Sequence, residues 1–197
     1  VCGSCAPLLD QLLGGDARPQ PVSGGRPLLA MTVIAALVTL LLAMLPGLPY
    51  VPSWERFVWH WDVLWRNGLF KQISGYTLAG MAVVGLLISL RKRAPRVNWG
   101  SFALWRNLHV GLGVGALLAL LLHTGGRLGN GLNAGLMSAF IALIVAGAAA
   151  GALIALEHRL SPVRAKRLRG SLTWVHILAF WPLPALLGFH VLKIYYY

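Results

Sequence analysis

Long apolar runs separated by short polar connections make up most of the chain. Five stretches of about 20 residues or more contain no Asp, Glu, Lys or Arg: 27–45, 72–90, 107–126, 128–156 and 170–192. A helix that crosses about 30 Å of hydrocarbon needs about 20 mostly apolar residues. The pattern therefore predicts an all-α integral membrane protein built as a bundle of five transmembrane helices. A glycine-rich segment, 124–131, divides the third run from the fourth and predicts a tight hairpin.

The basic residues are distributed unevenly over the connections. Twelve Lys and Arg side chains fall in the first, third and fifth polar segments, and five fall in the second, fourth and sixth. Because Lys- and Arg-rich loops stay in the cytoplasm, we expect a cytoplasmic N-terminus and a periplasmic C-terminus in a bacterial inner membrane. The runs 107–126 and 170–192 would then be parallel, both pointing outwards.

The composition excludes an ordinary soluble domain. Hydrophobic residues make up 57% of the chain and charged residues 11%, with a mean hydropathy of +0.70, whereas soluble domains average about 25% charged residues. A formal charge of +12 would suggest a nucleic acid partner if the basic residues lined one folded surface. They occur instead in clusters between apolar runs, so we expect membrane lipid and no nucleic acid.

One connection, 53–65, carries four tryptophans among scattered charges. The residues at helical spacing on one face are Trp54, Phe57, Val58, Trp61 and Trp65. Indole rings prefer the membrane–water interface, so this segment predicts one short interfacial amphipathic helix on the outer side. The final tyrosines, 195–197, fit the same belt.

Four of the six histidines form two matched pairs within the apolar runs. His109 and His123 lie in 107–126, His176 and His190 lie in 170–192, and each two are 14 residues apart. Fourteen helical steps return to within about 40° of the starting direction and advance about 21 Å. Parallel helices would therefore place His109 level with His176 near the inner side, and His123 level with His190 near the outer side.

Two facing pairs of imidazoles suit two six-coordinate haems, because each iron takes four porphyrin nitrogens and two axial ligands. Between His109 and His123, the small residues Gly113 and Ala116 would let a flat macrocycle approach the helix backbone. Pro182 and Pro184 would kink the last helix. The alternative is that the histidines are buried side chains that hydrogen-bond between helices.

The matched histidines resemble the dihaem core of membrane b-type cytochromes, found in the ferric reductase-like transmembrane family and in the cytochrome b of quinol-oxidising complexes. The resemblance covers about residues 72–193, and the ferric reductase-like family also places its ligands on its third and fifth helices. It implies two haem b groups. The implied axial ligands are His109, His123, His176 and His190, and the implied propionate partners are Arg106, Arg127 and Lys193. A flavin and nicotinamide domain usually follows in that family; no stretch of this sequence predicts one, so we expect a separate reductant.

Cys2 and Cys5 form a C-x-x-C motif, which zinc sites, redox pairs and iron–sulfur sites share. A c-type haem attachment is excluded because Ala6 stands where a histidine is needed. The run 2–13 resembles the second half of the bacterioferritin-associated-ferredoxin-like module, which binds a [2Fe-2S] cluster with four cysteines. The other two would lie upstream if the sequence begins inside a longer protein. Otherwise the two cysteines are vestigial, bind zinc with a partner or form a labile disulfide.

The chain is thus expected to have three parts: a partial ferredoxin-like segment (1–15), a linker (16–26) and a transmembrane dihaem cytochrome b domain (27–197). The expected function is transmembrane electron transfer, as the membrane subunit of a redox complex. Electrons would come from a cytoplasmic iron–sulfur or flavin partner and leave to a quinone or a periplasmic acceptor.

Two other functions stay open at this point. The first is a quinol-oxidising cytochrome b subunit in which Glu55, His60 and Asp62 accept the protons. The second is a haem-free membrane anchor whose helices merely pack, helped by the small-residue run 147–151.

Overall fold

The computed structural model describes residues 21–44, 63–93 and 100–196, except the side chains of 88–93. These residues are almost entirely helical and contain no strand. The helices are α2 (Gly25–Met44), α3 (Val63–Arg66), α4 (Gly68–Arg93), α5 (Phe102–Thr124), α6 (Leu132–Leu156), the 3-10 helix η3 (Glu157–Arg159), α7 (Pro162–Phe180) and α8 (Pro182–Tyr196).

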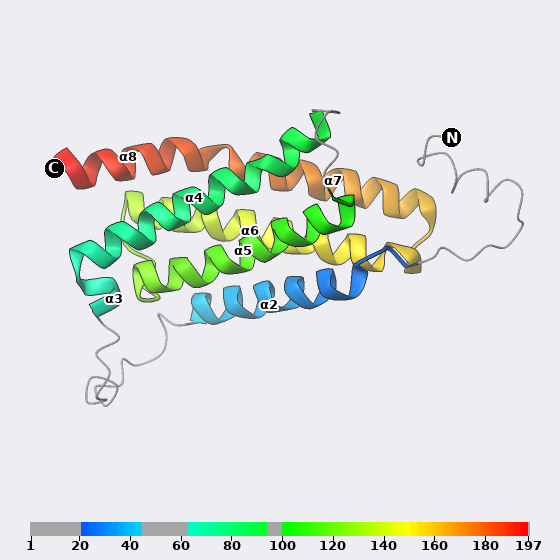
Figure 1. Ribbon diagram of the computed structural model, residues 1–197, viewed down its shortest axis with the longest axis horizontal. Coiled ribbons are helices and arrows are strands. Elements are labelled where there is room, and N and C mark those ends of the chain that lie inside the picture. The colour runs from blue at the N-terminus through cyan, green and yellow to red at the C-terminus, as the bar shows by residue number, and fades with distance from the viewer. Residues whose placement is uncertain (1–20, 45–62, 94–99, 197) are drawn as a thin grey trace, which may run out of the picture.

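The long helices form one bundle whose members lie side by side along its long axis (Figure 1). α6 packs against α2 and α7, and α5 packs against α4 and α2. α5 and α7–α8 run in the same direction (Figure 1), as the sequence predicts. Within the described helices, α5 does not pack closely along α7 or α8, so side chains rather than backbones meet between them.

The two ends of the bundle differ in charge. At one end α2, α5 and α7 begin while α4 and α6 finish; we call it the basic end. The basic residues placed there are Arg26, Arg91, Lys92, Arg93, Arg106, Arg159, Arg164, Lys166, Arg167 and Arg169. The opposite end contains the turn between α5 and α6, and we call it the hairpin end.

Within the described ranges, four helical segments are long and apolar enough to cross a membrane: α2, α5, α6 with η3, and α7 with α8. Large apolar side chains such as Leu37 and Trp174 are exposed along them, which indicates an integral membrane protein whose outer surface contacts lipid. The remaining predicted span, 72–90, is the second along the chain and lies within α4. This helix has 26 residues and packs along α5, but the four spans do not include it.

Small residues bring α2 and α6 together. A Cβ added at Gly151 would lie 2.5 Å from Thr32 Cγ2, so only glycine permits this approach. The hydroxyl of Thr32 donates to Leu29 O at 2.8 Å, which satisfies a buried polar group within α2 itself. The packing role predicted for 147–151 is therefore confirmed.

The predicted hairpin is also confirmed. Gly125 ends α5 with φ 60°, and its N–H donates to Leu121 O at 2.8 Å. The ring of Trp65 covers this turn so closely that a Cβ at Gly125 would lie 2.7 Å from it.

The last predicted helix, 170–192, was wrong in its start, because α7 begins at Pro162. This start suits proline, whose fixed φ and missing N–H are compatible with a first helical position. Charged residues do not stop a helix, so the charge-free run 170–192 covers only the apolar part of α7 and α8. The expected kink is confirmed: α7 ends at Phe180, and α8 begins at Pro182, whose missing N–H interrupts the hydrogen bonding.

Several predicted features lie outside the described residues. They include the cysteine segment 1–15, the linker as far as residue 20 and most of the interfacial helix 53–65. Of the last, the structure describes Val63, Leu64 and Trp65, which belong to α3.

Candidate functional site

The four paired histidines meet in two facing pairs. His109 of α5 faces His176 of α7 with ring centroids 6.1 Å apart and ring planes at 90°. His123 of α5 faces His190 of α8 at 6.4 Å and 72°. The pairing predicted from the spacing of 14 residues is therefore confirmed. We call His109–His176 the basic-end pair and His123–His190 the hairpin-end pair.

The ring separation excludes a direct hydrogen bond between the paired imidazoles and leaves room for a metal ion between them. With ring nitrogens about 1.15 Å from each centroid, an N–H···N bond of about 2.9 Å puts two imidazole centroids no more than about 5.2 Å apart. Two imidazoles on opposite sides of one metal ion, at about 2.0 Å, have centroids about 6.3 Å apart. The separations of 6.1 and 6.4 Å agree with the second arrangement. Two rings that bind one metal ion can each rotate about their metal–nitrogen bond, so interplanar angles of 90° and 72° are both compatible with this arrangement.

The donor set also indicates what kind of metal centre would fit. Across the described parts of the chain, no group of three or more His, Cys, Asp or Glu residues could hold a metal ion. Each pair offers two nitrogen ligands, which is too few for a bare cation with four or more protein ligands. A porphyrin iron needs two further ligands, because the macrocycle supplies four. The pairs therefore fit bis-histidine haems.

Hydrogen bonds at the hairpin-end pair leave Nε2 as the ligand atom. Ser74 Oγ lies 2.9 Å from His123 Nδ1 and donates its own proton to Lys71 O at 3.1 Å. With that proton directed at Lys71 O, the hydroxyl oxygen is placed to accept a hydrogen bond from His123 Nδ1. His190 Nδ1 donates to Asn133 Oδ1 at 2.9 Å. A neutral imidazole protonated at Nδ1 presents an unprotonated Nε2 to a metal.

The basic-end pair is held by backbone instead. His176 Nδ1 donates to Leu143 O in α6 at 3.1 Å. The same tautomer follows, because a carbonyl oxygen only accepts. The hydrogen bond ties the α7 histidine directly to the main chain of α6.

Glycines on neighbouring helices make room for three of the imidazoles. A Cβ added at Gly147 would lie 2.9 Å from His176 Cε1, and one added at Gly75 would lie 3.2 Å from His123 Cε1. At Gly85 the corresponding distance to His109 Cε1 is 3.9 Å. α6 thus contacts the basic-end pair through Gly147, while α4 contacts one histidine of each pair.

Sequence reasoning missed these supporting residues. Ser74 and Asn133 are polar residues within or beside apolar runs, which was an available signal. The run containing Gly147 was recognised for helix packing but not for contact with a histidine. Nothing local to Gly75 or Gly85 points to a histidine, because the contact depends on how α4 is rotated against α5.

The predicted small residues between the ligands lie inside the bundle. Gly113 is next to α6, where a Cβ would lie 3.7 Å from Ile144 Cδ1, and Ala116 is 8% exposed. Their contact with a macrocycle stays a prediction.

The predicted propionate partners lie at the two ends of the bundle. Arg106 Nη2 donates to Ser23 O at 2.9 Å, and Arg106 Nε is buried with no hydrogen-bond partner in the described structure. A buried unpaired donor of this kind suits a carboxylate. Arg127 and Lys193 are exposed at the hairpin end, near His123 and His190 in sequence.

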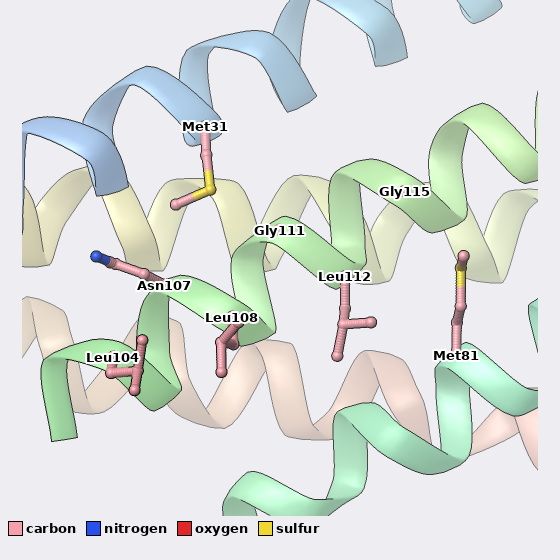
Figure 2. Close-up of a pocket in the computed structure, with 8 residues that line it drawn as sticks. All are labelled: Met31, Met81, Leu104, Asn107, Leu108, Gly111, Leu112 and Gly115. Atoms are coloured by element: carbon pink, nitrogen blue, oxygen red, sulfur yellow. The ribbon is translucent and has the colours of Figure 1, made fainter. Parts of the chain in front are cut away.

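A separate apolar groove of about 500 Å³ lies between α2, α4 and α5. Figure 2 shows Met31 from α2 and Met81 from α4 around it, with Gly111 and Gly115 of α5 between them. Asn107 is its one polar lining residue, and none of the paired histidines lines it. The groove is therefore distinct from the histidine pairs.

Cys2 and Cys5 lie outside the described residues, as do Glu55, His60 and Asp62, so the iron–sulfur and proton-acceptor roles stay predictions. Comparison with family models, curated proteins and solved structures gives no match to this chain. The fold and site by themselves define a class: a helical membrane bundle with two pairs of facing histidines.

Proposed function

We propose that this chain is a transmembrane electron-transfer protein that holds two haem b groups, one at each histidine pair. The observation that supports this most is the ring separation, 6.1 and 6.4 Å, which recurs at two sites along the same parallel helices. Both separations are too long for a direct hydrogen bond between the two imidazoles, and both match two imidazoles that bind one metal ion.

Each residue of the site has a defined role in this proposal. His109 and His176 would hold the haem iron at the basic end, and His123 and His190 would hold it at the hairpin end. Ser74, Asn133 and the Leu143 carbonyl hold the proton at Nδ1, so that Nε2 faces the metal. When bound, each haem supplies a one-electron Fe(III)/Fe(II) couple. Apolar helices around the pairs exclude water.

Arginine and lysine side chains would compensate the haem carboxylates. Arg106 offers its unpaired Nε at the basic end. Arg127 and Lys193 are the candidates at the hairpin end, where their exposure leaves their side chains accessible to a carboxylate.

The orientation of the bundle follows from its charge. Because basic ends stay in the cytoplasm, we place the basic end there and the C-terminus in the periplasm of a bacterial inner membrane. α4 is the fifth span, since it packs along α5 and exceeds the length that a crossing requires.

The electron donor would be a cytoplasmic iron–sulfur or flavin protein. The segment with Cys2 and Cys5 leads into α2, which begins at the basic end. A [2Fe-2S] cluster completed there would be on the cytoplasmic side of the membrane, with the basic end. The basic surface would favour an acidic partner. The acceptor on the other side would be a quinone or a periplasmic redox protein.

A pyridine haemochrome assay tests the proposal. We expect about two haem b groups per chain in the purified wild-type protein. Each single substitution removes one of the two ligands of one pair, so we expect about one haem per chain after His109→Ala, His123→Ala, His176→Ala or His190→Ala. His158→Ala is the matched control: it changes a histidine of η3 outside both pairs and should leave two. Wild-type protein that folds without haem would support a membrane anchor instead.

A further inference from the structure

We propose that Ser74 and Asn133 set the reduction potential of the hairpin-end haem by accepting hydrogen bonds from the Nδ1 atoms of His123 and His190. This inference rests on the proposed function, since it concerns ligands of that haem. It concerns two side chains on two different helices, α4 and α6, that sequence reasoning did not assign to the site.

Ser74 is placed to accept a hydrogen bond from His123 Nδ1. Its hydroxyl proton is used in the bond to Lys71 O, one helical turn earlier in α4. Its oxygen lies 2.9 Å from His123 Nδ1. Gly75, the next residue, leaves the imidazole in contact with the α4 backbone. The position of this hydrogen bond is therefore determined by α4, and the Lys71 carbonyl favours the direction from His123 to Ser74.

Asn133 is placed by the start of α6. Its N–H bonds to Asn130 O at 3.2 Å, and α6 begins at Leu132. Its side-chain oxygen accepts from His190 Nδ1 at 2.9 Å. The hairpin that connects α5 to α6 thus also positions the acceptor for the α8 histidine.

An acceptor at Nδ1 makes an axial imidazole more basic, and a more basic ligand stabilises Fe(III) relative to Fe(II). Removing the acceptor should therefore raise the potential of that haem, and replacing it by a carboxylate should lower it. At the basic end the acceptor for His176 is the Leu143 carbonyl, which no side-chain substitution removes. His176 thus differs from His123 and His190 in the kind of group that accepts from Nδ1: a backbone carbonyl instead of a side chain.

The experiment is a redox titration of the haem absorption band in purified protein, with haem content measured alongside. Asn133→Leu removes the acceptor at similar volume and should shift the hairpin-end haem to higher potential, whereas Asn133→Asp should shift it to lower potential. Ser74→Ala should shift it upwards, and Ser74→Thr, which restores a hydroxyl, should return it towards wild type. Repeating the series in a His176→Ala background isolates the hairpin-end haem.

Thr77→Val is the matched control on α4. The Thr77 hydroxyl donates to Ile73 O at 2.8 Å within its own helix. Its removal should leave both potentials unchanged. Low-spin electron paramagnetic resonance signals give a second readout, because altered ligand basicity changes the signal of one haem and not the other.

The outcomes separate the inference from the proposed function. Wild-type protein without two haems refutes the proposed function. Two haems in every variant, combined with unchanged potentials or with shifts of the same sign for Asn133→Leu and Asn133→Asp, overturns the inference alone. Equal shifts of both haems also overturn it, because they indicate a global structural effect. If Asn133→Asp loses haem, the Ser74→Ala and Ser74→Thr comparison decides by the same criterion.

Discussion

The basic-end and hairpin-end pairs have nearly the same ring separation, 6.1 and 6.4 Å, but different supports. At the basic end, the α6 backbone holds His176 through the Leu143 carbonyl and through close contact with Gly147. At the hairpin end, the acceptors are the side chains of Ser74 and Asn133.

This difference separates geometry from chemical tuning. A backbone carbonyl is present whatever residue occupies the position, so the acceptor at the basic end depends on helix packing. A side-chain acceptor can be exchanged for another group, so the hairpin end can change its ligand basicity while its packing is kept. If the proposed haems bind, the same pair geometry would therefore allow their potentials to differ.

The largest expected effect is steric, at the glycines against the imidazoles. Gly147→Ala places a methyl group 2.9 Å from His176 Cε1, so the ring must move, and overpacking of this kind costs about 1–3 kcal/mol. We expect loss of the basic-end haem. Gly75→Ala, at 3.2 Å from His123 Cε1, should weaken haem retention at the hairpin end. Gly85→Ala, at 3.9 Å from His109 Cε1, should leave haem retention at the basic end unchanged. The haem content of each variant after gel filtration shows whether haem loss decreases from Gly147→Ala to Gly75→Ala to Gly85→Ala.

Each helix offers a control for this series. Gly135 in α6 and Gly80 in α4 have no other atoms within 4 Å of an added Cβ. Gly135→Ala and Gly80→Ala should keep both haems. If Gly85→Ala removed more haem than Gly147→Ala, the contact distances would not explain the result.

A smaller effect is expected at the hairpin end, where Tyr76 and Tyr195 join α4 to α8. Their hydroxyl oxygens are 2.8 Å apart, and both residues are more than half exposed. A single neutral hydrogen bond contributes about 1 kcal/mol, and an exposed one less. Thermal unfolding of Tyr76→Phe, Tyr195→Phe and the double variant should give a coupling free energy below about 1 kcal/mol. Additive effects of the two substitutions would show that this bond adds no stability.

The smallest effect is expected from the ion pair at the basic end. Arg169 Nη1 lies 3.1 Å from Glu157 Oε2, and the two side chains are 52% and 23% exposed. Exposed ion pairs contribute about 0–1 kcal/mol and weaken as salt is added. Arg169→Gln should therefore lower the unfolding temperature slightly at low salt and leave both haems bound. A large loss of basic-end haem in this variant would mean that the pair supports the site, contrary to this comparison.

Part of this architecture follows from local sequence. The apolar runs predict helices because about 20 such residues span hydrocarbon, and the glycines of 124–131 predict the turn. The level pairing of the four histidines follows from helical periodicity once two helices are parallel. Pro182 marks the break between α7 and α8 because it lacks an N–H. Each of these properties depends on residues within one segment, or on the direction of successive segments.

The supports of the site could not be predicted in this way. Ser74 and His123 are 49 residues apart, and Asn133 and His190 are 57 apart. Their contacts depend on how α4, α6 and α8 are rotated and shifted against one another, which many weak packing interactions determine together. The start of α7 at Pro162 was also missed, because charge marks the edge of the hydrocarbon and not the end of a helix.

The sequence by itself determined the helices, the distribution of charge between the two ends and the heights of four histidines along two of the helices. Only the tertiary structure decided which atoms receive the Nδ1 protons and which glycines lie against the rings. The physical reason is the separation along the chain of the residues that each interaction joins. Periodicity and chain breaks act within one helix, whereas a hydrogen bond between helices requires a particular rotation of each helix about its axis, and no single segment specifies that rotation.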